Sequence, residues 1–151
     1  MGAVLQSWQA WAVLSAVFAA LTAIFAKLGV ADIPSDAATF IRTVVILAML
    51  GAILAATGEW RAVGRALSGG GGAGRALAFL LVSGLATGAS WLCYFRALKL
   101  GDAARVAPID KLSVVLVALF GVLFLGEQLS APNWLGVALI AAGAILVAYK
   151  G

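Results

Sequence analysis

The stretch from Val106 to Leu129 limits most strongly what this chain can fold into. It contains Pro108, then the adjacent pair Asp110 and Lys111, and the run from Leu112 to Gly126 carries no charged residue. A helix at a water-soluble surface spreads its charges along one face, whereas these charges are confined to one end. The pattern predicts a membrane-spanning helix with an acid and a base inside its apolar length. Since each such charge costs about 2.5–3.5 kcal/mol at mid-bilayer, we expect the pair to face a cavity or a partner.

Composition places the whole chain in the same class. Apolar residues make up 64% of the chain and charged residues 11%, against about 45–50% and about 25% in soluble domains. We therefore expect a multi-pass membrane protein. The net charge of +4 comes from basic residues near helix ends that form no stripe, which argues against nucleic-acid binding. There is no His, and the single Cys93 is expected to be a packing residue, so the sequence predicts neither a metal site nor a cofactor.

Five apolar segments are each long enough to cross a bilayer as a helix. They cover about residues 8–29, 37–57, 75–100, 104–126 and 134–149, and they predict an all-α membrane protein with one domain over residues 1–151. The first segment lacks the basic start of a signal peptide and is expected to be retained. Four consecutive glycines, Gly69 to Gly72, predict a flexible glycine-rich loop over residues 58–74.

An odd number of spans puts the two chain ends on opposite sides of the membrane; the side of the N-terminus is named the near side, the other the far side. Five charged residues then lie in the far-side halves of their helices: Lys27, Arg42, Arg96, Asp110 and Lys111. For Lys27 and Arg96 two readings stay open, a cavity role or a long side chain that reaches the interface. Arg42 and the Asp110–Lys111 pair lie deeper, which favours a polar cavity. Pro108 supports this, because it removes a backbone donor and makes the start of the fourth helix irregular, as in the broken helices of transporter sites.

The third and fifth segments carry patterns of small and polar residues. In the third, a polar face recurs at steps of four, three and four residues and is expected to line a passage together with Trp91: Ser83, Thr87, Ser90 and Tyr94. In the fifth, Gly136 and Gly143 lie seven residues apart, and small residues at this spacing let two helix backbones approach closely. We expect this pair to form a seam between two copies of the chain; packing within one copy is the alternative.

Several short motifs resemble the EamA-type repeat of the drug/metabolite transporter superfamily. They are IFAKLG at residues 24–29, FIR at 40–42, YFRALK at 94–99, API at 107–109, FLGE at 124–127 and LGVALI at 135–140, followed by Gly143. The resemblance covers nearly the whole chain. It implies one five-span repeat, where most relatives look like two inverted repeats with ten spans. It also implies a partner that completes the protein, either a second copy in antiparallel orientation or another small subunit.

The fifth segment is also similar to the glycine heptad through which small multidrug resistance transporters dimerise. Those four-helix relatives use a glutamate in the middle of the first helix to exchange protons for cationic drugs. Here the first segment has no acid, and the only carboxylate predicted within a span, Asp110, is surrounded by basic residues. This departure argues against cationic drugs and favours a substrate with a negative or zwitterionic part.

These patterns predict a secondary transporter of amino acids or other small zwitterionic or anionic metabolites, with export as the expected direction, working by alternating access in the inner membrane of a bacterium. Asp110 is the expected coupling group or counter-ion, balanced by Lys111, while Arg42 and Lys27 attract the anionic group of the substrate. A permanent structural ion pair of Asp110 is the alternative. Two other functions stay open, a subunit of a lipid-carrier flippase or small multidrug-type exporter, and a membrane interaction protein that transports nothing. No nucleophile–base pair or paired carboxylates appear, so we expect no enzyme activity.

Overall fold

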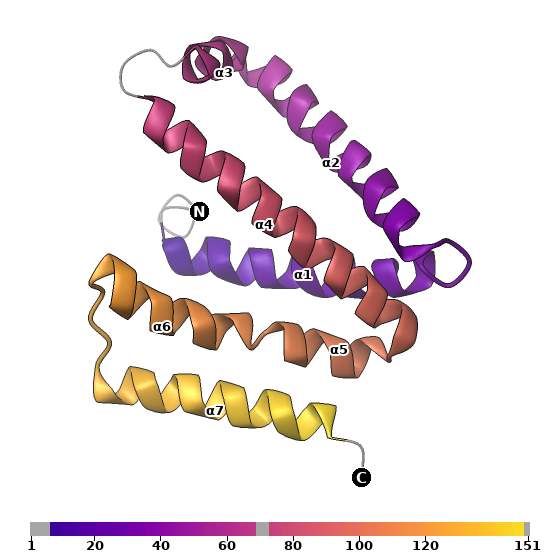
Figure 1. Cartoon of the computed structure of the whole chain (residues 1–151), viewed down its shortest axis with the longest axis vertical. Coiled ribbons are helices and arrows are strands. Elements are labelled where there is room, and N and C mark those ends of the chain that lie inside the picture. Colours follow the sequence, from indigo (N-terminus) through magenta and orange to yellow (C-terminus); the bar gives the residue numbers. More distant parts are fainter. Residues whose placement is uncertain (1–6, 69–72, 150–151) are drawn as a thin grey trace. The chain divides into compact units, whose positions relative to one another are not determined.

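The computed structural model describes residues 7–68 and 73–149 of the chain (Figure 1). Its helices are α1 (Trp8–Gly29), α2 (Ser35–Thr57), α3 (Trp60–Leu67), α4 (Ala73–Leu100), α5 (Ala103–Asp110), α6 (Ser113–Leu125) and α7 (Ala131–Ala148), and no strand occurs in the described part. Within the described ranges, five segments are long and apolar enough to cross a membrane: Trp8–Gly29, Ser35–Thr57, Gly74–Leu100, Ala103–Leu125 and Ala131–Ala148. The predicted all-α membrane fold with five spans is therefore confirmed, and each span starts at or a few residues before the expected position.

Glycines and prolines mark several ends of these helices. Gly58 after α2 and Gly126 after α6 adopt the left-handed backbone conformation, with φ of 72° and 69°. Their N–H groups donate to the carbonyls of Leu54 and Gly121 and so satisfy acceptors that the last turn would leave open. Pro132 lies in the first turn of α7, where a missing N–H costs no helical bond. These local signals explain why the long apolar stretches break into separate spans.

The loop predicted over residues 58–74 is wrong for Trp60–Leu67, which forms the helix α3. Its arginines, Arg61 and Arg65, are four residues apart on one face, and apolar residues occupy the other, a pattern typical of a helix lying at a membrane surface. The Trp60 ring lies against α2, 3.8 Å from where a side chain on Gly51 would begin. The four glycines behind the loop prediction lie outside the described residues. The prediction gave these glycines too much weight and overlooked the amphipathic pattern of Trp60–Leu67.

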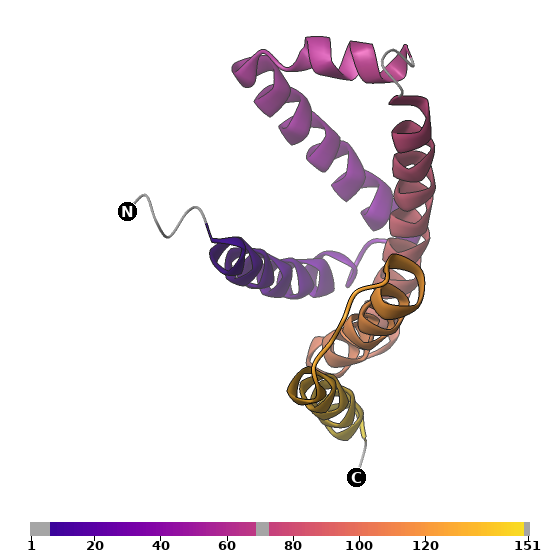
Figure 2. The same ribbon diagram turned by 90° about the vertical axis from the view of Figure 1, so that its left-hand side faces the viewer.

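The contacts within the chain define two compact units, Gly29–Arg96 and the combination of Met1–Leu28 with Ala97–Gly151. Each is described by itself, and the single domain over residues 1–151 stays a prediction. The unit Gly29–Arg96 contains α2, α3 and most of α4. Figures 1 and 2 show α2 and α4 side by side where α2 begins and well separated toward α3.

The second unit contains α1, the last residues of α4, and α5, α6 and α7. Helix α7 runs back along both α5 and α6 (Figure 1). Among the described residues few side chains are fully enclosed: Leu98 of this unit is 0% exposed, and Val30 and Phe95 of the other unit are 1% and 2% exposed. Large apolar side chains cover the outside of every span, which suits helices whose solvent is lipid.

Candidate functional site

The fourth membrane span is interrupted at Lys111 and Leu112, between α5 and α6. The Leu112 N–H donates to the Ile109 carbonyl at 3.0 Å, and the Val114 N–H donates to the Lys111 carbonyl at 3.0 Å. Each of these bonds reaches back three residues instead of four, so the backbone is tighter here than in an α-helix. Pro108 lies inside α5, and the interruption begins just after that helix ends. The irregularity expected at the start of this helix therefore lies beyond the proline, whose missing N–H weakens the last turn of α5.

Asp110 and Lys111 lie at this interruption and form an ion pair. The Lys111 Nζ donates to the Asp110 Oδ2 at 3.1 Å, and the two side chains are 55% and 34% exposed, respectively. Asp110 is the last residue of α5, and Lys111 follows it directly at the interruption. The carboxylate is thus paired with the Lys111 ammonium and still keeps part of its surface exposed.

Lys27, near the end of α1, is held by main-chain oxygens. Its Nζ donates to the Leu98 carbonyl at 2.7 Å and to the Gly101 carbonyl at 2.8 Å. Leu98 lies in the last turn of α4 and Gly101 directly follows the helix, a place where carbonyls lack helical partners and attract cations. The sequence left two interpretations of Lys27 open, a cavity role or a long side chain that reaches the interface. A contact between the ends of two helices is a third possibility that it did not predict.

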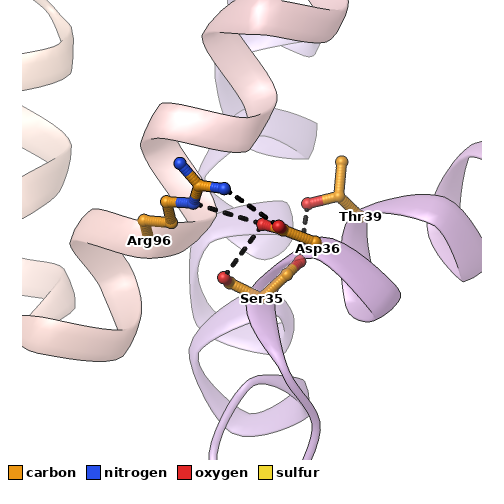
Figure 3. Close-up of polar contacts among 4 residues, drawn as sticks. All are labelled: Ser35, Asp36, Thr39 and Arg96. Atoms are coloured by element: carbon orange, nitrogen blue, oxygen red, sulfur yellow. Dashed lines mark hydrogen bonds and ion pairs between the residues drawn. The ribbon is translucent and has the colours of Figure 1, made fainter.

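Arg96, on α4, forms a two-point ion pair with Asp36 in the first turn of α2 (Figure 3). Its Nε donates to Oδ1 at 3.2 Å and its Nη2 to Oδ2 at 2.9 Å, while the Ser35 hydroxyl donates to Oδ1 at 3.2 Å. The N-cap residue of α2 is Pro34, which makes no side-chain cap, and the Asp36 carboxylate in the first turn pairs with α4. This partner of Arg96 was not predicted from the sequence.

Arg42 lies about 10 Å along α2 from the first residue of that helix, at 1.5 Å per residue. Its guanidinium carbon is 4.0 Å from the centroid of the Trp91 ring and 5.4 Å from that of Phe95, both on α4. Arg42 and Trp91 are half-buried, and Phe95 is buried. The structure thus brings together two residues that the sequence analysis named separately, and adds Phe95, which the helical spacing of four from Trp91 could have indicated.

The polar face of α4 is largely uncovered within the described part of the chain. Ser83, Thr87 and Ser90 are exposed and Tyr94 is half-buried. The Thr87 hydroxyl donates to the Ser83 carbonyl at 2.9 Å, so it is occupied within its own helix. The lining role of this face stays a prediction.

The two glycines predicted to form a seam are likewise open. A side chain built at Gly136 or at Gly143 would meet no atom within 4 Å. There is thus room for a Cβ atom at both positions, although Gly136 is half-buried and Gly143 is exposed. The seam stays a prediction.

The comparisons with known proteins agree with one another. The EamA-like transporter family matches residues 6–149. The chain is 68% identical over 143 residues to a protein of a Sinorhizobium species described as an uncharacterized transporter in the cobO 3′ region, with 95% of this chain and 97% of that protein covered. No solved structure matches the chain. The chain has five apolar spans, as a multi-pass membrane protein does, and the family match covers nearly its whole length. This chain therefore belongs to the EamA-like transporter family.

Proposed function

We propose that the protein is a secondary transporter of small zwitterionic or anionic metabolites such as amino acids, and that it works as an exporter in a bacterial inner membrane. The observation that carries the proposal is the interruption between α5 and α6, with Asp110 and Lys111 beside it. A membrane-spanning helix tolerates irregular backbone where it lines a cavity, and transporters place their substrate and ion sites at such interruptions. The family match supports transport as the activity, and the basic surroundings of Asp110 support the substrate class.

In this proposal Asp110 is the coupling group, and it alternates between the Lys111 ammonium and the transported species. The pair is built for exchange because it joins adjacent residues and leaves both side chains partly exposed. A pair of fixed structural importance would be enclosed and satisfied by further hydrogen bonds. A second copy in antiparallel orientation supplies the opposite half of the pathway, since alternating access requires a related gate on the other side.

The Asp110→Asn variant is expected to lose transport while it keeps the fold. We expect its uptake into proteoliposomes to fall by about tenfold or more, because a charge interaction of about 1.4 kcal/mol already corresponds to a factor of ten. The measurement is uptake of a panel of radiolabelled amino acids and small carboxylates by purified protein, with detergent gel filtration as the check on folding.

Asp102→Asn is the matched control for this experiment. Asp102 precedes α5 in the same segment, is exposed, and makes no side-chain cap, so its charge can be removed without loss of a contact in α5. Full uptake by Asp110→Asn would contradict the coupling role. An Asp110→Asn protein that does not fold would instead support the structural ion pair and remove Asp110 from the proposed mechanism.

A further inference from the structure

Arg42 differs from the other cations of the predicted site in what neutralises it. Arg96 pairs with Asp36, Lys111 pairs with Asp110, and Lys27 binds two carbonyls. Within residues 7–68 and 73–149, no carboxylate forms an ion pair with Arg42; the rings of Trp91 and Phe95 flank its guanidinium, and Tyr94 lies close enough to interact with it electrostatically. Among the described residues, a permanently charged group at membrane depth is thus stabilised by aromatic side chains and not by a paired carboxylate.

The aromatic contacts leave part of this charge unsatisfied. A ring face below a cation contributes about 0.5–2 kcal/mol, which is less than an ion pair with two hydrogen bonds provides inside a low-dielectric site. A guanidinium has five N–H donors around its edge, and a ring beside the cation accepts none of them in a conventional hydrogen bond. The donors that face away from the rings remain available to an acceptor, and an anionic acceptor also supplies the missing charge.

We propose that Arg42, Trp91 and Phe95 form a binding site for a carboxylate group of the ligand, with Arg42 as the charged contact and the two rings as its support. This inference rests on the proposed transport function for its role and deepens it by naming the group that is recognised. The fork of a guanidinium matches the two oxygens of a carboxylate, and one positive charge balances a monoanion. A dianion would need a second cation, and the Arg96 guanidinium in the same unit is occupied by Asp36.

The positions of the two helices support a site that a ligand can reach. From its first turn inward, α2 contacts α4 first through Asp36 with Arg96 and then through Arg42 with Trp91. Beyond this point the two helices separate (Figures 1 and 2), and a side chain built at Gly88 or Gly84 of α4 would meet no atom within 4 Å. Arg42 therefore lies at the inner limit of the contact between α2 and α4, next to the part of α4 that no described residue covers.

The test measures binding of a planar monocarboxylate, para-fluorobenzoate, to the full-length protein in detergent. Fluorine NMR is the method that detects the bound probe. We expect saturable binding of this probe, and binding about tenfold weaker in Arg42→Lys, because lysine keeps the charge but loses the planar fork and the stacking. The neutral para-fluorobenzamide is expected not to compete, and the dianion para-fluorophenylphosphonate is expected to bind more weakly than the benzoate.

Arg75→Lys is the matched control, since Arg75 is also an arginine of α4 over an aromatic ring, 5.8 Å from the centroid of Phe79, but is exposed. It is expected to bind the probe as the unaltered protein does. If Arg42→Lys fails to fold, Trp91→Leu replaces it, with an expected loss of about fivefold from removal of the ring face.

Equal affinity for the benzoate and the benzamide, tighter binding of the phosphonate, or unchanged binding in Arg42→Lys would each overturn the proposal. If the cluster only holds α2 against α4, Arg42→Lys would bind the benzoate as the unaltered protein does, and the variant would have a lower melting temperature. Because binding is measured without transport, its outcome is independent of Asp110. Arg42-dependent binding in a protein whose Asp110→Asn variant transports normally would retain this site and reject the proposed coupling mechanism.

Discussion

Replacing Lys27 by methionine is expected to lower the free energy of unfolding in detergent by about 3–6 kcal/mol, from two charge-assisted hydrogen bonds of about 1.5–3 kcal/mol each. The Nζ donates at 2.7 Å and 2.8 Å to the carbonyls of Leu98 and Gly101, and methionine of similar length offers no donor. The loss leaves two carbonyls at the end of α4 without this partner in an apolar setting. The measurement is chemical unfolding of the purified protein followed by circular dichroism.

Arg61→Met serves as the control for the Lys27 variant. It removes an exposed cation from α3, and its expected effect is small because exposed charges without a buried partner contribute little. Equal stability of the two variants would contradict the role given to Lys27. The result also decides how the residue is used. A large loss of stability favours a link between the ends of α1 and α4 over the substrate contact expected from its place in the sequence.

The positions of the spans along the chain could be predicted because they depend on composition alone. Long apolar runs must be helical in a bilayer, and they end where glycine, proline and charged residues gather, as at Gly58 and Gly126. The position of a charge along its helix follows from the same reading, so Arg42 and Asp110 could be recognised as lying inside their spans. The order of residues along the chain was therefore enough to predict the fold, which the structure confirms.

The partners of those charges could not be predicted in the same way. A lysine or arginine side chain is long enough to choose among several neighbours, and the choice depends on how each helix is rotated and on which helix lies beside it. Lys27 therefore contacts carbonyls that belong to residues 98 and 101. Arg96 contacts Asp36 in the first turn of α2, a pairing that the sequence did not predict. Nor does a proline fix where a helix breaks, since the tightened backbone follows Pro108 by about one turn.

Gly143→Leu is expected to weaken association between copies of the protein by about a hundredfold, because a seam of small residues depends on close approach of two backbones. The protomer itself is expected to fold normally, since Gly143 is exposed and a Cβ atom at this position meets no atom within 4 Å. Any loss of association can therefore be assigned to the second copy. The measurement is the fraction of dimers in liposomes, from single-molecule photobleaching at decreasing protein-to-lipid ratios.

Gly84→Leu provides the control that locates the seam, because Gly84 of α4 is also open within 4 Å and also lies in a membrane span. We expect this variant to dimerise as the unaltered protein does; dimer loss at Gly84 with none at Gly143 would move the contact from α7 to α4. Reporters fused to the C-terminus are expected on both membrane faces in comparable amounts, and one-sided reporters would contradict the antiparallel arrangement. If Gly143→Leu abolishes both dimerisation and uptake, while binding of para-fluorobenzoate at Arg42 persists, then each copy recognises its ligand alone. The second copy is in that case needed to complete the path across the membrane.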